Sequence, residues 1–187
     1  MAAQAKGHDR DERGGNGALS VIIAARNEES YIGDCLQSLL DQDDSAGPVE
    51  VILAANACTD DTAGVAALYR PAFEARGWSL NILDVPTPGK VNALNAADSA
   101  ANGMALVFLD ADVRLDAEIL GQLRQVLETD TPRYATGTLE VAPAKTWFTR
   151  HYARFWTQLP FVQGGTVGAG LFAVNRAGRG RWDLFPD

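Results

Sequence analysis

The sequence is poor in cysteine and in long apolar runs. Its 187 residues include two cysteines, too few for a disulfide-built scaffold or a four-cysteine zinc site. No stretch approaches the roughly 18 consecutive apolar residues of a membrane-spanning helix. Residues 1–17 are polar and lack the apolar core of a signal peptide. We therefore predict a cytoplasmic protein with a flexible tail, residues 1–17, and a single domain, residues 18–187.

Basic residues are also scarce, and the charge is uneven. The chain has 16 Lys and Arg against 24 Asp and Glu, a formal net charge of -8. Six of the basic residues but only two of the acidic ones lie in residues 141–187. The acidic body argues against nucleic-acid binding. The basic end suits an anionic substrate or membrane surface, or is an ordinary solvated surface, and the sequence leaves these interpretations open.

Three common site motifs are missing. The segment that follows the first apolar run, residues 25–28, has no Gly-x-Gly-x-x-Gly, which argues against NAD or FAD. The chain contains neither the Gly-x-x-x-x-Gly-Lys-Ser/Thr of a P-loop nor the Gly-x-Ser-x-Gly of a hydrolase elbow.

The sequence does contain alternating strand-like and helix-like segments. Apolar runs predict strands at 19–25, 49–55, 78–85, 104–109, 134–141 and 171–174. Amphipathic spacing predicts helices at 28–40, 62–75, 90–102, 116–127 and 146–158. Pro71 should kink or end the second helix. The alternation is typical of an α/β fold, a mostly parallel sheet with helices on both faces.

Polar residues follow these strands, at the edge where open parallel sheets bind ligands. Asn56 offers an amide donor and acceptor suited to the edge of a base. Asp60 is more simply explained as a cap for the next helix. Lys90 begins a helix, where its charge would favour a phosphate, although a lone lysine there is more often an ordinary surface residue.

The tripeptide Asp110-Ala111-Asp112 follows a buried strand. Of the three Asp-x-Asp tripeptides in the chain, it alone lies at the predicted ligand-binding edge. Residues i and i+2 of an extended chain point the same way, so both carboxylates can flank a diphosphate and bind Mn²⁺ or Mg²⁺. The alternative is a pair of caps for the helix behind them.

Four segments in this order resemble a known family. They are SVIIAARNEE at 20–29, NACTDDT at 56–62, GKVNALN at 89–95 and VFLDAD at 107–112. The family is glycosyltransferase family 2, nucleotide-sugar enzymes of the GT-A (Rossmann-like) fold. The resemblance covers about residues 19–130, with a weaker match to 185. It implies a nucleotide-binding half at 18–130 and an incomplete acceptor half at 131–187.

The resemblance also implies residue roles. The expected nucleotide contacts are Ala25, Asn27, Glu28, Asn56, Lys90, Asp110 and Ala111. Of these, the Ala25 backbone and the Glu28 carboxylate would hold the nucleoside, and Asn56 would face the base. Asp110 on the ribose side and Asp112 on the metal are the expected catalytic residues. The expected pocket for the donor sugar or acceptor is Gly168, Ala169 and Gly170.

The function implied is metal-dependent, inverting transfer from a UDP- or GDP-type nucleotide-diphospho-sugar. Two departures qualify it. Ala55 stands where the family usually has Asp, and the family's acidic pair is missing, with only Asp183 and Asp187 in its region. We therefore expect a truncated chain that binds donor but transfers poorly. The alternatives are a non-catalytic nucleotide-binding module or scaffold and, less favoured, a sugar-nucleotide pyrophosphorylase.

Six aromatic residues fall within residues 147–161, interleaved with Arg150, His151 and Arg154. Aromatic side chains beside arginines suit contact with the inner face of a membrane, or an acceptor that carries a lipid diphosphate. The alternative, slightly favoured by the sequence, is a helix that packs under further C-terminal elements.

Overall fold

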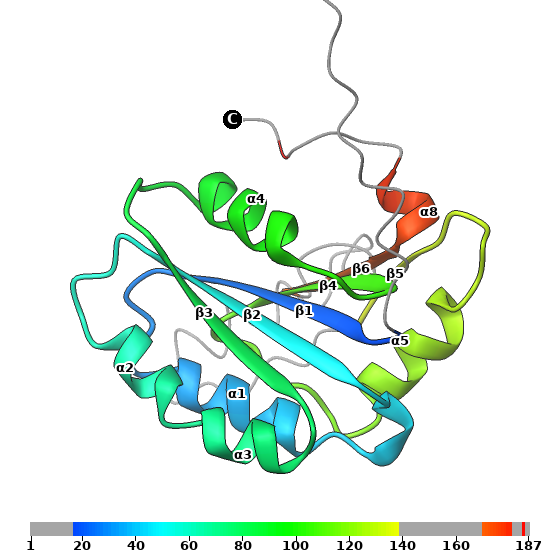
Figure 1. Ribbon diagram of the computed structural model, residues 1–187, viewed down its shortest axis with the longest axis horizontal. Helices are drawn as coiled ribbons and strands as arrows, with labels where there is room; N and C mark the ends of the chain where they lie inside the picture. Colours follow the sequence, from blue (N-terminus) through cyan, green and yellow to red (C-terminus); the bar gives the residue numbers. More distant parts are fainter. Residues whose placement is uncertain (1–16, 139–169, 181–184, 186–187) are drawn as a thin grey trace, which may run out of the picture.

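A six-stranded sheet forms the centre of the computed structural model, which describes residues 17–138, 170–180 and 185 (Figure 1). Its strands are β1 (Leu19–Ala25), β2 (Val49–Asn56), β3 (Ser79–Val85), β4 (Ala105–Asp110), β5 (Tyr134–Thr136) and β6 (Leu171–Asn175). They lie in the order β3-β2-β1-β4-β6-β5. Strands β1 to β4 are parallel, whereas β6 runs antiparallel to both β4 and β5. The predicted mostly parallel α/β fold is confirmed.

Helices cover both faces of the sheet (Figure 1). On one face lie α1 (Ile32–Leu40), α2 (Thr62–Ala67), α3 (Arg70–Ala75) and α5 (Ile119–Leu127). The opposite face is covered by α4 (Lys90–Ala100). Two short elements, η1 (Asp44–Ala46) and α8 (Arg176–Arg179), complete the described fold. No helix in the described part of the chain has the length and hydropathy needed to cross a membrane.

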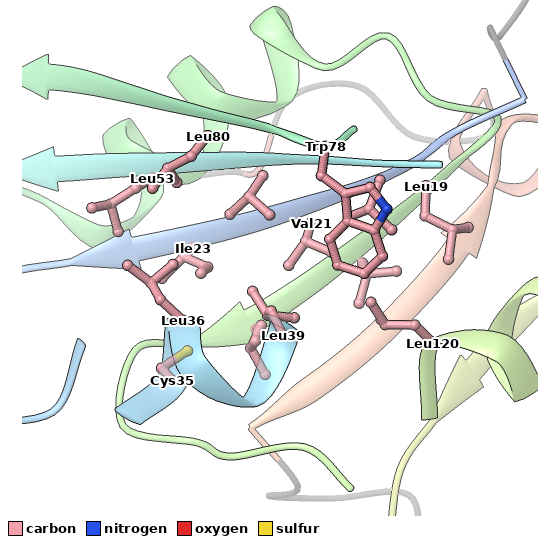
Figure 2. Close-up of a cluster of buried hydrophobic side chains, with 14 of the residues drawn as sticks. Leu19, Val21, Ile23, Cys35, Leu36, Leu39, Leu53, Trp78, Leu80 and Leu120 are labelled. Atoms are coloured by element: carbon pink, nitrogen blue, oxygen red, sulfur yellow. The ribbon is translucent and has the colours of Figure 1, made fainter. Parts of the chain in front are cut away.

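Two apolar clusters result from alternation along the strands. Leu19, Val21 and Ile23 of β1 face the helices that include α1 and α5 (Figure 2). The intervening Ile22 packs on the opposite face, in the cluster that includes α4. Cys35 of α1 belongs to the first cluster and is fully buried. Burial, with a smaller contribution from Asp112 and Asp110, raises the pKa of its thiol to about 12, so the thiolate form is suppressed.

Most predicted elements are present, with shifted ends. Helix α1 begins at Ile32 and not at residue 28; the preceding residues form a turn in which the N–H groups of Tyr31 and Ile32 both donate to the Glu28 carbonyl. The helix predicted at 62–75 is interrupted just before Pro71, which occupies the first turn of α3. Helix α5 begins at Ile119 and not at residue 116. The predicted helix at 146–158 and the tail up to residue 16 lie outside the described residues.

Candidate functional site

Three parallel strands bring their carboxyl ends to one edge of the sheet. Ala25 of β1 is in register with Ala55 of β2, and Ala24 is in register with Asp110 of β4. The polar segments that follow these strands therefore meet at this edge, as the sequence predicted. We call this the carboxyl edge of β1, β2 and β4.

The loops after β1 and β2 are bonded to each other. Asn27, with a left-handed φ of 58°, accepts a hydrogen bond of 2.8 Å at its side-chain oxygen from the Thr59 N–H. The carboxylate of Asp60 accepts from the Glu29 N–H, and that of Glu29 accepts from the Asp61 N–H, both at 3.1 Å. These reciprocal bonds fix the backbone just after Ala25, where the sequence predicted contact with the nucleoside.

Thr62 ties both loops to the start of α2. Its hydroxyl donates to Asp60 and accepts from the Glu28 N–H at 2.9 Å. Asp60 also accepts from the Thr62 N–H, the first N–H of α2, but the N-cap residue is Asp61, one position later than predicted, and it makes no side-chain capping bond. The Thr62 hydroxyl is the main reason that the pKa of Asp60 is lowered. Thr62 was not among the residues predicted for the site, although threonine at the start of a helix commonly bonds nearby backbone groups.

Lys90 and Asp110 meet at the carboxyl edge. The Lys90 Nζ lies 2.6 Å from Asp110 Oδ1, although the two residues come from α4 and β4. Their side chains are 63% and 43% exposed. Because both side chains are exposed, both are accessible to a ligand. An exposed ion pair also contributes little to stability, so a ligand can displace it at small cost.

Negative charge gathers around Glu28. Partial burial is the largest cause of the raised pKa of its carboxyl group, followed by the charges of Asp112, Asp60 and Asp110. Lys90 acts in the opposite direction. Residues from four separate segments of the sequence thus share one electrostatic environment, and its excess of negative charge favours a bound cation.

Asp112 is exposed beside this cluster and offers the hard oxygen ligand that Mn²⁺ and Mg²⁺ prefer. Within the described residues, no three His, Cys, Asp or Glu side chains converge closely enough to hold a metal ion on their own. The donor set fits a divalent ion that takes its remaining oxygen ligands from a bound diphosphate and water, because Mg²⁺ commonly binds one or two carboxylates plus substrate phosphates.

Gly170 is the described member of the predicted glycine pocket, whereas Gly168 and Ala169 lie outside the described residues. The carbonyl of Gly170 accepts a 2.8 Å hydrogen bond from the Asp110 N–H. Its φ is +60°, and an added Cβ would lie 2.4 Å from Val113 Cγ2. Glycine is therefore required for β6 to start beside Asp110. Ala111, between the two aspartates, is buried.

The Asn56 side chain makes other hydrogen bonds than the prediction assumed. Its side chain was expected to face a base, but it is 2% exposed and bonded to the segment between β3 and α4. The amide nitrogen donates to the carbonyls of Val85 and Thr87, at 3.1 and 2.7 Å, and the oxygen accepts from the Gly89 N–H at 2.8 Å. Contact between Asn56 and a nucleobase stays a prediction.

Comparison with known proteins identifies relatives of this chain. Residues 20–181 match the family described as Glycosyl transferase family 2. A curated relative, 4,4'-diaponeurosporenoate glycosyltransferase of Staphylococcus aureus (strain USA300), is 35% identical over 102 residues, which cover 51% of this chain and 24% of the relative. The chain thus aligns with about a quarter of that relative's length.

Solved structures share the fold. Residues 1–349 of S. aureus TarS, in complex with UDP-GlcNAc, superpose with a TM-score of 0.58 at 25% identity, over 69% of this chain and 36% of that TarS chain. The mannosyltransferase PcManGT of Pyrobaculum calidifontis, in complex with GDP-Man and Mn²⁺, gives a TM-score of 0.66 at 20% identity, over 90% of this chain and 47% of PcManGT. Both likenesses support the predicted GT-A fold.

Proposed function

Because this chain belongs to glycosyl transferase family 2, we propose that it transfers a sugar from a nucleotide-diphospho-sugar to an acceptor hydroxyl, with inversion at the anomeric carbon. One observation carries the proposal: Asp110, its partner Lys90, and the charges of Asp112 and Glu28 share the carboxyl edge of β1, β2 and β4. Ligands of open α/β sheets bind at this edge. The TarS complex with UDP-GlcNAc supports the donor class.

Different residues of the edge bind different parts of the nucleotide-sugar donor. The backbone after Ala25, fixed by Asn27, borders the nucleoside, and Asp110 lies on the ribose side. Lys90 faces the anionic part of the nucleotide, where its charge favours binding. The Glu28 carboxylate completes the nucleoside side. The carbonyl of Gly170 accepts from the Asp110 N–H, so the start of β6 borders the side of the edge on which we place the donor sugar.

Transfer with inversion is a single displacement. The acceptor oxygen forms a bond to the anomeric carbon while the bond from that carbon to the diphosphate oxygen breaks, and the nucleoside diphosphate leaves with the electron pair. A general base takes the proton of the acceptor hydroxyl. The two acidic residues predicted in its region, Asp183 and Asp187, lie outside the described residues, so the base is not assigned.

Asp112 would hold a divalent cation, Mn²⁺ or Mg²⁺, against the diphosphate. Such an ion stabilises the negative charge that the leaving diphosphate gains. The surrounding carboxylates explain why a cation is favoured here, and Lys90 adds a second positive charge on the nucleotide side.

Two alternative functions, a sugar-nucleotide pyrophosphorylase and a non-catalytic nucleotide-binding module, compare differently with a transferase. Family membership favours a transferase over a sugar-nucleotide pyrophosphorylase. A nucleotide-binding module without the base shares every described feature of the edge, and a product assay distinguishes it from a transferase. The sugar acceptor, the cytoplasmic location and contact with a membrane stay predictions from the sequence.

Nucleotide binding tests the proposal at Asp112. Asp112→Asn removes one anionic ligand, and we expect it to reduce the Mn²⁺-dependent gain in UDP or GDP affinity on the order of tenfold, about 1.4 kcal/mol. Isothermal titration calorimetry with and without Mn²⁺ measures this gain.

Asp116→Asn is the matched control, because Asp116 is an exposed carboxylate in the same connection to α5. It changes the charge of the chain equally and should leave the gain intact. Equal metal dependence in the wild type and Asp112→Asn would remove Asp112 from the metal site. Failure of the wild type to bind either nucleotide would overturn the proposed function.

A further inference from the structure

We propose that Asn56 is a positioning residue, which sets the place of Lys90 at Asp110 through the β3–α4 loop, residues 86–89. This inference rests on the proposed function, because it concerns how the nucleotide-binding edge is assembled. Asn56 is at the end of β2 and Lys90 begins α4, so the two are linked through the loop that Asn56 holds.

The hydrogen bonds of Asn56 enclose this loop. Its amide nitrogen donates to Val85 at the end of β3 and to Thr87 inside the loop, and its oxygen accepts from Gly89 at the loop's end. At 2% exposure, the side chain is covered by protein. A nucleobase could bond to the amide hydrogens only if those bonds to the loop were broken.

The loop in turn determines where α4 starts. Gly89, the N-cap residue, has a φ of +137°, which side chains rarely adopt, and α4 receives no side-chain capping bond. The bond from the Gly89 N–H to Asn56 therefore anchors the residue that directly precedes Lys90. Asn92 adds a second brace by donating to the Pro88 carbonyl at 3.1 Å.

An asparagine suits this position because it donates and accepts at once. Alanine would leave the carbonyl of Thr87 and the N–H of Gly89 without this partner. Aspartate would still accept from Gly89 but would present a carboxylate to the carbonyls of Val85 and Thr87. Both substitutions should therefore loosen the loop and release Lys90 from Asp110.

A double-mutant cycle tests the coupling. We expect Asn56→Ala to weaken UDP binding in the presence of Mn²⁺ on the order of tenfold in the wild-type background. In the Lys90→Met background, the same substitution should change the affinity by less than about twofold, because its effect passes through Lys90. An equal loss in both backgrounds would overturn the proposal.

Comparison of UDP with GDP separates positioning from base reading. A positioning role predicts equal losses for the two nucleotides, since Lys90 does not contact the base. A change in the UDP-to-GDP preference would instead make Asn56 a base-reading residue and overturn the inference. Asn56→Asp repeats the cycle if the alanine variant does not fold.

Hydrogen exchange supplies a readout that needs no nucleotide. Asn56→Ala should speed exchange of the Gly89 amide and the first turn of α4, with α5 unchanged. Unchanged protection at Gly89 would overturn the inference. If the wild type bound neither UDP nor GDP, the proposed function would fail, but this measurement would still decide whether Asn56 holds the loop.

Discussion

At the scale of single residues, the ionised carboxylate of Glu28 lies in an electrostatically unfavourable environment. Partial burial and three neighbouring aspartates favour its protonated form, so its pKa in the folded protein lies above the ordinary 4.5. Between pH 4.5 and the raised pKa, Glu28 is therefore more often protonated in the folded state than in the unfolded state. Stability contributed by this group falls as the pH rises through the window between 4.5 and the raised pKa.

Replacement of Glu28 tests this effect. Glu28→Gln removes the charge, so we expect the variant to have a higher melting temperature than the wild type at pH 7. The difference should shrink as the pH falls below 4.5, where the wild-type carboxyl group is also neutral. Thermal unfolding followed by circular dichroism at several pH values measures it.

Glu74→Gln, on the exposed surface of α3, is the matched control and should show a much smaller pH-dependent difference. A Glu28→Gln variant that is less stable than the wild type at pH 7 would mean that the carboxylate makes a favourable contact in the fold. Mn²⁺ should reduce the advantage of the variant, because a cation at Asp112 offsets the repulsion at Glu28.

At the scale of elements, α4 and α8 are joined by a buried ion pair. Arg179 of α8 bonds the Asp98 carboxylate of α4 through its Nε, at 3.1 Å, and through a second guanidinium nitrogen. The side chains are 6% and 3% exposed. The pair links the segment that carries Lys90 to the segment that follows Gly170, so it ties together two parts of the site that are distant in the sequence.

Removal of one partner should be costly. Asp98→Ala leaves the Arg179 charge buried without this carboxylate, and loss of one member of a buried pair typically costs about 3–5 kcal/mol. Urea unfolding at equilibrium measures the change in the free energy of unfolding.

The exposed pair of Asp34 and Arg114 provides the control. Its atoms are 3.6 Å apart and both side chains are 71% exposed. Asp34→Ala should cost about 0–1 kcal/mol, because water solvates the remaining charge. If the two substitutions had the same effect, the buried pair would add nothing beyond an ordinary surface contact.

At the scale of the whole molecule, β4 joins the parallel part of the sheet, β1 to β4, to the antiparallel part, β5 and β6. It pairs with β1 on one side and with β6 on the other. Phe108 of β4 also stacks on Phe172 of β6, with ring centroids 4.4 Å apart. Neither part keeps a complete sheet without the other, so we expect them to unfold together.

Chemical unfolding checks this cooperativity. Circular dichroism and tryptophan fluorescence should report one coincident transition. UDP or GDP with Mn²⁺, at about 100 times its dissociation constant, should shift the whole transition by about 2.7 kcal/mol. Two separated transitions, or a shift confined to one probe, would contradict unfolding as a single cooperative unit.

The sequence alone determined the elements and the edge at which the site lies. A continuous apolar run located β1 at its observed bounds, because a strand buried on both faces needs such a run. The strand pattern also placed Asp110 at the end of a strand, and Glu28 and Lys90 in connections that follow strands, since parallel strands present their carboxyl ends together. The pairing of β6 against β4 did not follow from local pattern, because strand direction depends on contacts distant in the sequence.

Tertiary structure decided which polar side chains are exposed to a ligand and which are buried in hydrogen bonds to other parts of the chain. Asn56 and Lys90 both follow strands, yet the loop buries one and leaves the other exposed beside Asp110. The bonds of Thr62 to Asp60 and Glu28 likewise required the first two loops to meet in space. Residue type and spacing specify what a side chain can do, whereas its hydrogen-bond partners depend on backbone groups that only the folded chain brings within 3 Å.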